Sequence, residues 1–172
     1  MLYNEEIINN IKDLLSKKKL TLSVAESVTA GHLQAAFSSA LEASKFFQGG
    51  ITAYNAGQKT KHLNIEPIAA LEDDCVTEKV ACEMAIQSNK MFISDYAIAI
   101  TGYATKMPEN GLNDLFAFFA IANKEEVILV KKITTNKERV DAQIDYTTKV
   151  IKEFQKLLKT KKPSGRNKKL VS

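Results

Sequence analysis

The sequence predicts an α/β fold in which helices cover both faces of a mixed β-sheet, a three-layer α/β/α arrangement. Two observations predict it. In the first half of the chain, segments with helical apolar spacing alternate with short β-rich runs, the pattern of parallel strands joined by helices. In the second half, two β-rich runs follow each other, joined by residues 123–125, which indicates an antiparallel pair.

The first predicted elements are a helix, a strand and a second helix. An apolar stripe at helical spacing runs over residues 7–15, and Leu20–Val24 has the composition of a strand. A helix beginning at His32 carries another stripe that extends to Ala40 and Leu41. The chain then reads as a glycine turn and a short strand within 47–54.

The later elements are predicted from caps and apolar runs. A helix follows Tyr54, with Lys59 one turn into it, and Thr77 is the expected N-cap of a helix whose apolar stripe runs to Met91. The last long helix carries Val140 on its apolar side, together with residues up to Leu158. Three more strands are predicted over residues 96–101, 115–122 and 126–134.

Composition indicates one domain, because 172 residues with 45% apolar content can bury one core. We expect this domain to span residues 1–158. Residues 159–172 are rich in lysine and arginine and nearly free of apolar side chains, which predicts a disordered, solubilising tail. A salt-sensitive contact of that tail with RNA or DNA is the less favoured reading.

The sequence argues against several other classes of protein. No apolar run reaches the roughly 18 to 20 residues of a membrane span, and the first residues do not resemble a signal peptide, so we expect a cytoplasmic protein without a membrane partner. Cys75 and Cys82 are expected to be reduced thiols. His32 and His62 stand alone, and no residue demands a metal or an organic cofactor.

A candidate nucleophile lies in the run Ala25–Gly31, between a predicted strand and a predicted helix. Ser27 would sit on the strand-to-helix turn, where the first amides of the helix direct unpaired N–H groups toward an anion. The alternative is an ordinary helix start with a satisfied hydroxyl, because serine, threonine and glycine are preferred there.

A candidate base follows in the next strand-to-helix connection. Tyr54 would end a strand, and Lys59 would lie one turn into the next helix. A lysine that shares a site with a serine can accept its proton when burial lowers the lysine pKa. Taken separately, Lys59 reads as a solvated helix lysine and Tyr54 as a packed strand residue.

These segments and two later ones resemble the carboxy-terminal domain family of the competence/damage-inducible protein CinA. The family pattern AES-C-T-G-G stands here as Ala25–Gly31, and GG-x-x-AY-S-N-x-x-K as Gly49–Lys59. The pattern VS-E-x-V-A-x-x-M-A stands as Val76–Ala85, and AIAITG-x-AGP-GG as Ala97–Ala104. Four motifs in the same order, spread over residues 4–158, are more specific than any one of them.

The resemblance implies the CinA C-terminal domain fold and, for stand-alone members, a nicotinamide-nucleotide amidase of NAD metabolism. The reaction hydrolyses the carboxamide of nicotinamide mononucleotide to nicotinic acid mononucleotide and ammonia. Its catalytic roles fall on Ser27, Lys59 and Tyr54, with a pyridine nucleotide as partner and no cofactor. Substrate contacts would fall on Glu26, Thr29, Ala30, Gly31, Asn55, Thr101 and Gly102. A homo-oligomer is also expected.

The chain departs from the family pattern at several places. Leu112–Leu115 replaces Lys-Pro-Val-Gly, and Lys137 and Asp141 replace the usual arginine pair. Ala30 replaces a glycine, and Asn55-Ala56 replaces Ser-Asn. The glycine-rich loop after Gly102 becomes Ala104–Gly111, which keeps one glycine. The alternative function is therefore a catalytically degenerate member that acts as a nucleotide-binding module.

The mechanism expected from these residues begins with transfer of the Ser27 proton to Lys59 and attack of Ser27 on the amide carbon. Amides near Thr29, Ala30 and Gly31 would hold the oxyanion, and Tyr54 would help to deliver a proton to ammonia. The alternative is that Lys59 activates water directly. The strands before Ser27, Tyr54 and Thr101 should all end at the same edge of the sheet, where open α/β sheets bind ligands.

Overall fold

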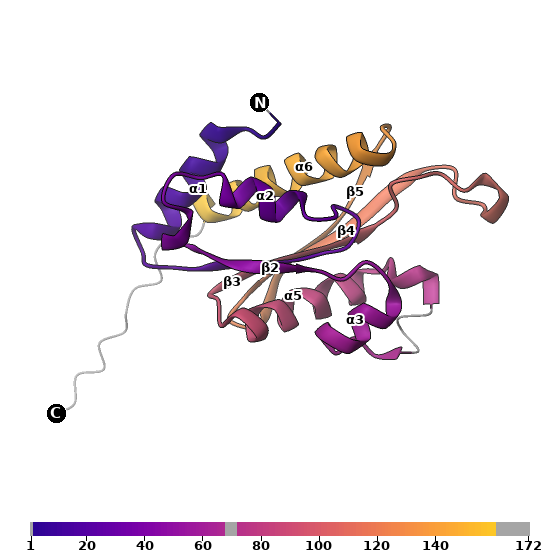
Figure 1. The fold of residues 1–172 in the computed structure, drawn as a ribbon, viewed down its shortest axis with the longest axis horizontal. Coiled ribbons are helices and arrows are strands. Elements are labelled where there is room, and N and C mark those ends of the chain that lie inside the picture. Colours follow the sequence, from indigo (N-terminus) through magenta and orange to yellow (C-terminus); the bar gives the residue numbers. More distant parts are fainter. Residues whose placement is uncertain (1, 68–71, 161–172) are drawn as a thin grey trace.

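The computed structural model describes residues 2–67 and 72–160. A five-stranded sheet lies between two layers of helices (Figure 1). The helices are α1 Glu5–Ser16, α2 His32–Ser38, α3 Ala56–Leu63, α5 Glu78–Phe92 and α6 Arg139–Thr160, and short 3-10 turns lie at Ala43–Lys45, Glu72–Cys75 and Pro108–Asn110. The strands are β1 Leu22–Glu26, β2 Phe47–Thr52, β3 Tyr96–Gly102, β4 Leu115–Asn123 and β5 Glu126–Thr135.

The sheet has the order β2-β1-β3-β4-β5 and is mixed, as predicted. Strand β1 pairs in parallel with β2 on one side and β3 on the other, whereas β3, β4 and β5 pair antiparallel. Because β1, β2 and β3 run in the same direction, their carboxyl ends meet at one edge. That edge carries Ser27, Tyr54 and Thr101, as the sequence predicts.

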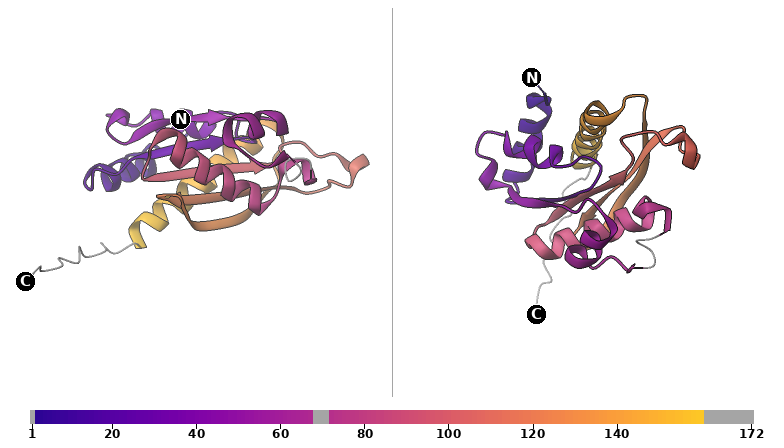
Figure 2. Two further views of the ribbon diagram at one scale, coloured as in Figure 1. Left: turned by 90° about the horizontal axis from the view of Figure 1, so that it is seen from below. Right: turned by 45° about the vertical axis from the view of Figure 1, so that its right-hand side comes forward.

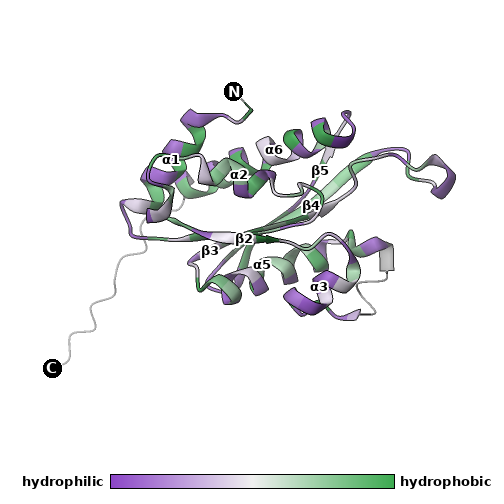
Figure 3. Cartoon of the chain, in the orientation of Figure 1, coloured by the Kyte–Doolittle hydropathy of each residue, from purple (hydrophilic) through white to green (hydrophobic). Residues whose placement is uncertain are grey.

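Two apolar cores hold the layers together. Helices α1, α2 and α6 cover one face, with Phe37 and Phe154 packed edge to face at 6.4 Å between ring centroids. Helices α3 and α5 cover the other face, where Val80 and Met84 meet small side chains of the sheet such as Ala99. The second view of Figure 2 shows the sheet between these layers. In Figure 3 the outer surfaces of the helices carry much of the hydrophilic colour.

The predicted element boundaries need two corrections. The first strand begins at Leu22 instead of Leu20 and extends to Glu26, so Ser27 follows the strand directly. The glycines predicted to form a turn, Gly49 and Gly50, lie inside β2. A side chain at Gly50 would meet Val24 of the neighbouring strand at 2.4 Å, so the glycine permits close packing within the sheet and is not a turn signal.

Three residues assigned to buried stripes are exposed. Leu41 is 72% exposed because α2 ends at Ser38, so helical spacing no longer sets its direction, although Ala40 is still buried. Met91 and Val140, exposed by 44% and 56%, lie in the last turn of α5 and the first turn of α6. Helical periodicity predicts which face is apolar, but it does not show where the partner surface ends.

The connection between β3 and β4, residues 103–114, forms an arm that projects from the end of the sheet (Figures 1 and 2). Met107 and Leu112 exchange backbone hydrogen bonds across it at 3.0 and 3.1 Å. Gly111 turns the chain with a φ of 78°. The segment that replaces the family's glycine-rich loop is thus a structured hairpin-like arm.

The described part of α6 ends at Thr160, two residues beyond the predicted domain boundary. The predicted basic tail otherwise lies outside the described residues. Over residues 2–67 and 72–160, no helix is both long and apolar enough to cross a membrane.

We predict that Gly102→Ala destabilises the protein. A Cβ atom at Gly102 would lie 2.4 Å from the Cβ of Ala117, where β3 and β4 pair closely, so the strands must shift. We expect a loss of roughly 1–3 kcal/mol in the free energy of unfolding, measured by urea denaturation.

Gly57→Ala is the matched control, because its Cβ would meet nothing nearer than 3.5 Å. Alanine favours the helix there, so this variant should gain about 0.5–1 kcal/mol. If Gly102→Ala were as stable as the parent, the close packing at Gly102 would be contradicted.

Candidate active site

Ser27 is fixed at the end of β1 by the main chain. Its N–H donates to the carbonyl of Ile100 at 3.0 Å, which continues the pairing of β1 with β3 by one residue. The side chain is 6% exposed. The hydroxyl therefore lies at the carboxyl edge of the sheet, nearly covered by protein.

Lys59 brings its amine to this hydroxyl from α3. Its Nζ donates to Ser27 Oγ at 2.9 Å and to the Tyr54 carbonyl at 3.4 Å. The residue is 2% exposed, and within the described residues no carboxylate pairs with it. Burial lowers the pKa of Lys59 below its ordinary value, against a smaller opposing effect of the Cys75 thiol.

Helix α3 places Lys59 through its cap. The side chain of Asn55 accepts a hydrogen bond from the Gln58 N–H at 3.0 Å and fixes the start of the helix. Lys59 then lies one turn on, on the face that also buries Leu63. Asn55, which we expected to contact substrate, thus has a visible structural role as the N-cap.

Tyr54 contacts Ser27 and Lys59 through its main-chain carbonyl. Its carbonyl accepts from Lys59 Nζ, and Ser27 Oγ lies 3.5 Å from the same oxygen. The side chain is 65% exposed and lies beyond the end of β2. The structure brings the Tyr54 carbonyl to the site and leaves much of the ring at the surface.

Glu26 organises the turn that carries Ser27. The residue is fully buried, and its carboxylate accepts from the Thr29 hydroxyl at 2.6 Å and from the amides of Gly31, Leu33 and Gln34 at 3.1, 3.0 and 2.8 Å. A carboxylate is favourable at the positive end of α2. Glu26 and Thr29, expected as substrate contacts, are hydrogen-bonded to each other, and Glu26 also binds the start of the helix.

The turn also determines which backbone donors remain near Ser27. Ala30 N–H donates to the Ser27 carbonyl at 3.1 Å, and Gly31 N–H is used by Glu26. Both residues have positive φ, 49° and 102°. Within residues 2–67 and 72–160 the amides of Val28 and Thr29 form no hydrogen bond. These two amides, instead of those of Ala30 and Gly31, are the donors left for an oxyanion.

Thr101 and Gly102 end β3 beside Ser27. The Thr101 hydroxyl is buried and donates to the Cys75 carbonyl at 2.9 Å, which ties β3 to the segment before α5. Gly102 allows β4 to approach closely. Both residues, expected to contact substrate, support the edge of the sheet.

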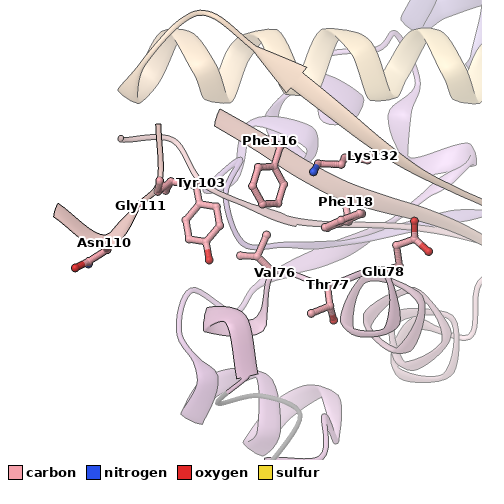
Figure 4. A pocket seen from close by; sticks show the side chains of 10 residues that line it. Val76, Thr77, Glu78, Tyr103, Asn110, Gly111, Phe116, Phe118 and Lys132 are labelled. Carbon is pink, nitrogen blue, oxygen red and sulfur yellow. The ribbon is translucent and has the colours of Figure 1, made fainter. Parts of the chain in front are cut away.

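A cavity of about 420 Å³ lies on the same face of the sheet, beyond Thr101. The start of α5, strands β4 and β5 and the arm form its walls (Figure 4). Its lining includes Glu78, Tyr103, Asn110, Phe116, Phe118 and Lys132. Sequence reasoning missed this aromatic wall. The alternation of Phe116 and Phe118 with alanine in β4 is a signal that could have indicated one side of a strand.

No cluster of histidine, cysteine and acidic side chains suited to a metal ion occurs in the described part of the chain. Cys75 and Cys82 are not joined in a disulfide. The polar groups beside Ser27 at the edge of the sheet include its hydroxyl, the Lys59 amine and backbone amides.

The sequence model of the CinA C-terminal domain matches residues 4–158. The chain belongs to the CinA C-terminal domain family. A CinA-like protein from Chlorobium chlorochromatii is 32% identical over 93% of this chain, and Protein MG115 from Mycoplasma genitalium is 31% identical over 87%. The chain spans 38% of the length of the first and 96% of the second. Another CinA-like protein, from Prochlorococcus marinus, is 42% identical over 102 residues, 24% of its own length.

Solved structures of this superfamily have the same fold. The competence damage-inducible protein A from Klebsiella pneumoniae superposes with a TM-score of 0.87 at 20% identity, over 93% of this chain and 99% of that one. The CinA superfamily protein from Escherichia coli gives 0.79 at 25% identity, over 90% and 88%. The mixed five-stranded sheet is therefore the fold of the family.

We predict that Glu26→Gln loosens the turn that carries Ser27. The amide group presents a donor where the carboxylate accepts, so at least one buried N–H loses its partner. We expect a loss of roughly 1–3 kcal/mol in the free energy of unfolding. The surface variant Glu125→Gln, which weakens only the exposed pair with Lys90, should change it by less than about 0.5 kcal/mol. Similar losses in both variants would contradict a special role for Glu26.

We predict that Lys59→Met stabilises the fold in a pH-dependent way. The pKa of Lys59 is lowered on folding, so the unfolded chain binds more protons and stability rises with pH toward the ordinary lysine pKa of 10.5. Methionine removes this dependence. The variant should exceed the parent in Tm most at about pH 6 and least at about pH 10, measured by thermal unfolding. A difference that does not vary with pH would contradict the burial of an ionisable amine.

Proposed function

We propose that the protein is an amidohydrolase that converts nicotinamide mononucleotide to nicotinic acid mononucleotide and ammonia. The main support for this proposal is the contact of 2.9 Å between Lys59 Nζ and Ser27 Oγ. Among the described residues, no carboxylate forms an ion pair with this amine. A buried amine with a lowered pKa can be neutral at moderate pH and accept a proton from the hydroxyl. The resemblance to stand-alone deamidases of the family supplies the substrate.

The reaction begins when neutral Lys59 takes the Ser27 proton and Ser27 Oγ forms a bond to the carboxamide carbon. The carbonyl oxygen becomes an oxyanion that the amides of Val28 and Thr29 stabilise. The C–N bond then breaks, and the proton held by Lys59 leaves with ammonia. Water attacks the resulting ester with Lys59 again as the base, which releases the carboxylate and restores Ser27.

The carbonyl of Tyr54 keeps the amine of Lys59 beside Ser27 throughout this cycle. Its phenol lies at the surface of the same edge and assists proton delivery to the departing ammonia. In the alternative route Ser27 remains a hydrogen-bond donor and Lys59 activates water directly. A burst of ammonia before the steady rate would favour the acyl-enzyme route.

The second candidate is a nucleotide-binding module without turnover. The arm of residues 103–114, which replaces the glycine-rich loop, favours it because the arm projects from the end of the sheet and lacks most of the family's glycines. Ala30 also favours this candidate, because it adopts a positive φ that is unfavourable for a residue with a Cβ atom and that the family's glycine would adopt easily. The intact contact between Ser27 and Lys59 argues against the binding module.

We predict that the parent releases ammonia from nicotinamide mononucleotide and that Ser27→Ala and Lys59→Met each lower kcat by at least about a thousandfold. The parent rate should rise with pH through the lowered pKa of Lys59, because only the neutral amine accepts the proton. An ammonia assay across pH checks both statements.

Lys61→Met, an exposed lysine of the same helix, is the control and should keep the parental rate. Binding of the nucleotide by a folded parent that releases no ammonia would reject the amidase and leave the binding module. Full activity in Ser27→Ala with loss in Lys59→Met would support direct activation of water.

A further inference from the structure

The cavity between the start of α5 and the aromatic side of β4 is not used by the chemistry at Ser27. Phe116 contacts Tyr103 on one side and Phe118 on the other, edge to face, with ring centroids 5.5 and 5.7 Å apart. Lys132 reaches over this wall, with Nζ 4.0 Å from the Phe116 ring centroid and 5.7 Å from that of Phe118. Figure 4 shows the ammonium directed toward Phe116. The rings thus hold a cation at the cavity.

Over residues 2–67 and 72–160 this cation forms no ion pair with a carboxylate. Among the ion pairs of the described residues none includes Lys132. The neighbouring Lys131 points to the opposite face of the sheet and pairs with Glu153 of α6. Successive residues of a strand alternate between faces, so only Lys132 of this pair belongs to the cavity.

The sheet aligns this cation with the proposed nucleophile. Glu26 pairs with Ile100, so Ser27 lies beside Thr101; Thr101 pairs with Phe118, and Phe118 pairs with Lys132. These residues form one row across β1, β3, β4 and β5. Three strand spacings of about 4.8 Å place the Cα atoms of Ser27 and Lys132 roughly 14 Å apart. The Lys132 ammonium lies over the same aromatic wall, nearer to Phe116 than to Phe118.

We propose that the cavity binds the anionic end of the substrate whose carboxamide is attacked by Ser27, with Lys132 as its counter-ion. This assignment rests on the proposed amidase function and identifies Lys132 as the residue that distinguishes a phosphorylated carboxamide substrate from an unphosphorylated one. The arm supplies the Asn110 side chain on the same cavity. A lysine can fill this role, because its ammonium can act as a point charge for phosphate.

Glu78 is the group that opposes this role. It lies in the first turn of α5 and lines the cavity with Lys132. Its carboxylate repels a phosphate, so the anion must lie on the Lys132 side, toward Phe116. The two side chains therefore have opposite expected effects on binding: removal of the Lys132 charge weakens it, and removal of the Glu78 charge strengthens it.

The test compares nicotinamide mononucleotide with nicotinamide riboside, which lacks the phosphate. In the parent, KM for the riboside should exceed that for the mononucleotide by about tenfold, the contribution of one charge-assisted contact. In Lys132→Ala this ratio should fall to about one through weaker binding of the mononucleotide, with kcat unchanged. Glu78→Gln should increase the ratio.

Lys131→Ala is the matched control, because it removes an adjacent lysine from the other face and should leave the ratio as in the parent. Binding of both compounds to Ser27→Ala, measured by calorimetry, separates this inference from the proposed function. A folded protein that binds the mononucleotide in a Lys132-dependent way but releases no ammonia would reject the amidase and keep the anion site. A ratio that is the same in Lys132→Ala and the parent would overturn the anion site, and so would the absence of any binding.

Discussion

One buried carboxylate, that of Glu26, holds the geometry on which the site depends. Four hydrogen bonds converge on it from the turn and the first residues of α2. They fix the turn that carries Ser27, and they account for the positive φ of Ala30 and Gly31, because the chain must fold back over the carboxylate. The same arrangement uses the Gly31 amide and leaves those of Val28 and Thr29 without partners. Glu26 thereby influences which backbone amides beside Ser27 are already engaged in hydrogen bonds.

The buried amine of Lys59 is the second constraint, and it opposes stability. A lysine without a carboxylate partner favours its neutral form when it is removed from water, so the fold loses stability at neutral pH in order to hold it. Helix α3 is short, and its Asn55 cap fixes the register that directs Lys59 to Ser27. Such an arrangement has a functional explanation, because an apolar residue in the same place would pack without this penalty.

The sheet aligns Ser27 with the cavity at Lys132. Parallel pairing of β1 with β3 places Ser27 beside Thr101, and antiparallel pairing with β4 and β5 extends the row to Lys132. Residues more than a hundred positions apart in sequence thus share one face of the sheet. Burial fixes the register of β1, β3 and most of β4, and backbone pairing with β4 then places β5 and Lys132.

The sequence alone determined the layers, the mixed sheet and the candidates Ser27 and Lys59, because apolar periodicity, helix caps and strand-to-helix turns are local features. It also identified the edge where the parallel strands end. Tertiary structure decided what each polar group does: Glu26 and Thr29 bind to the turn, Thr101 binds the segment before α5, and Tyr54 contributes its carbonyl. The aromatic wall and Lys132 were also absent from the sequence-based prediction. Hydrogen-bond partners and cavities arise from segments far apart in the chain, so their assignment requires the pairing of strands and the packing of helices on them.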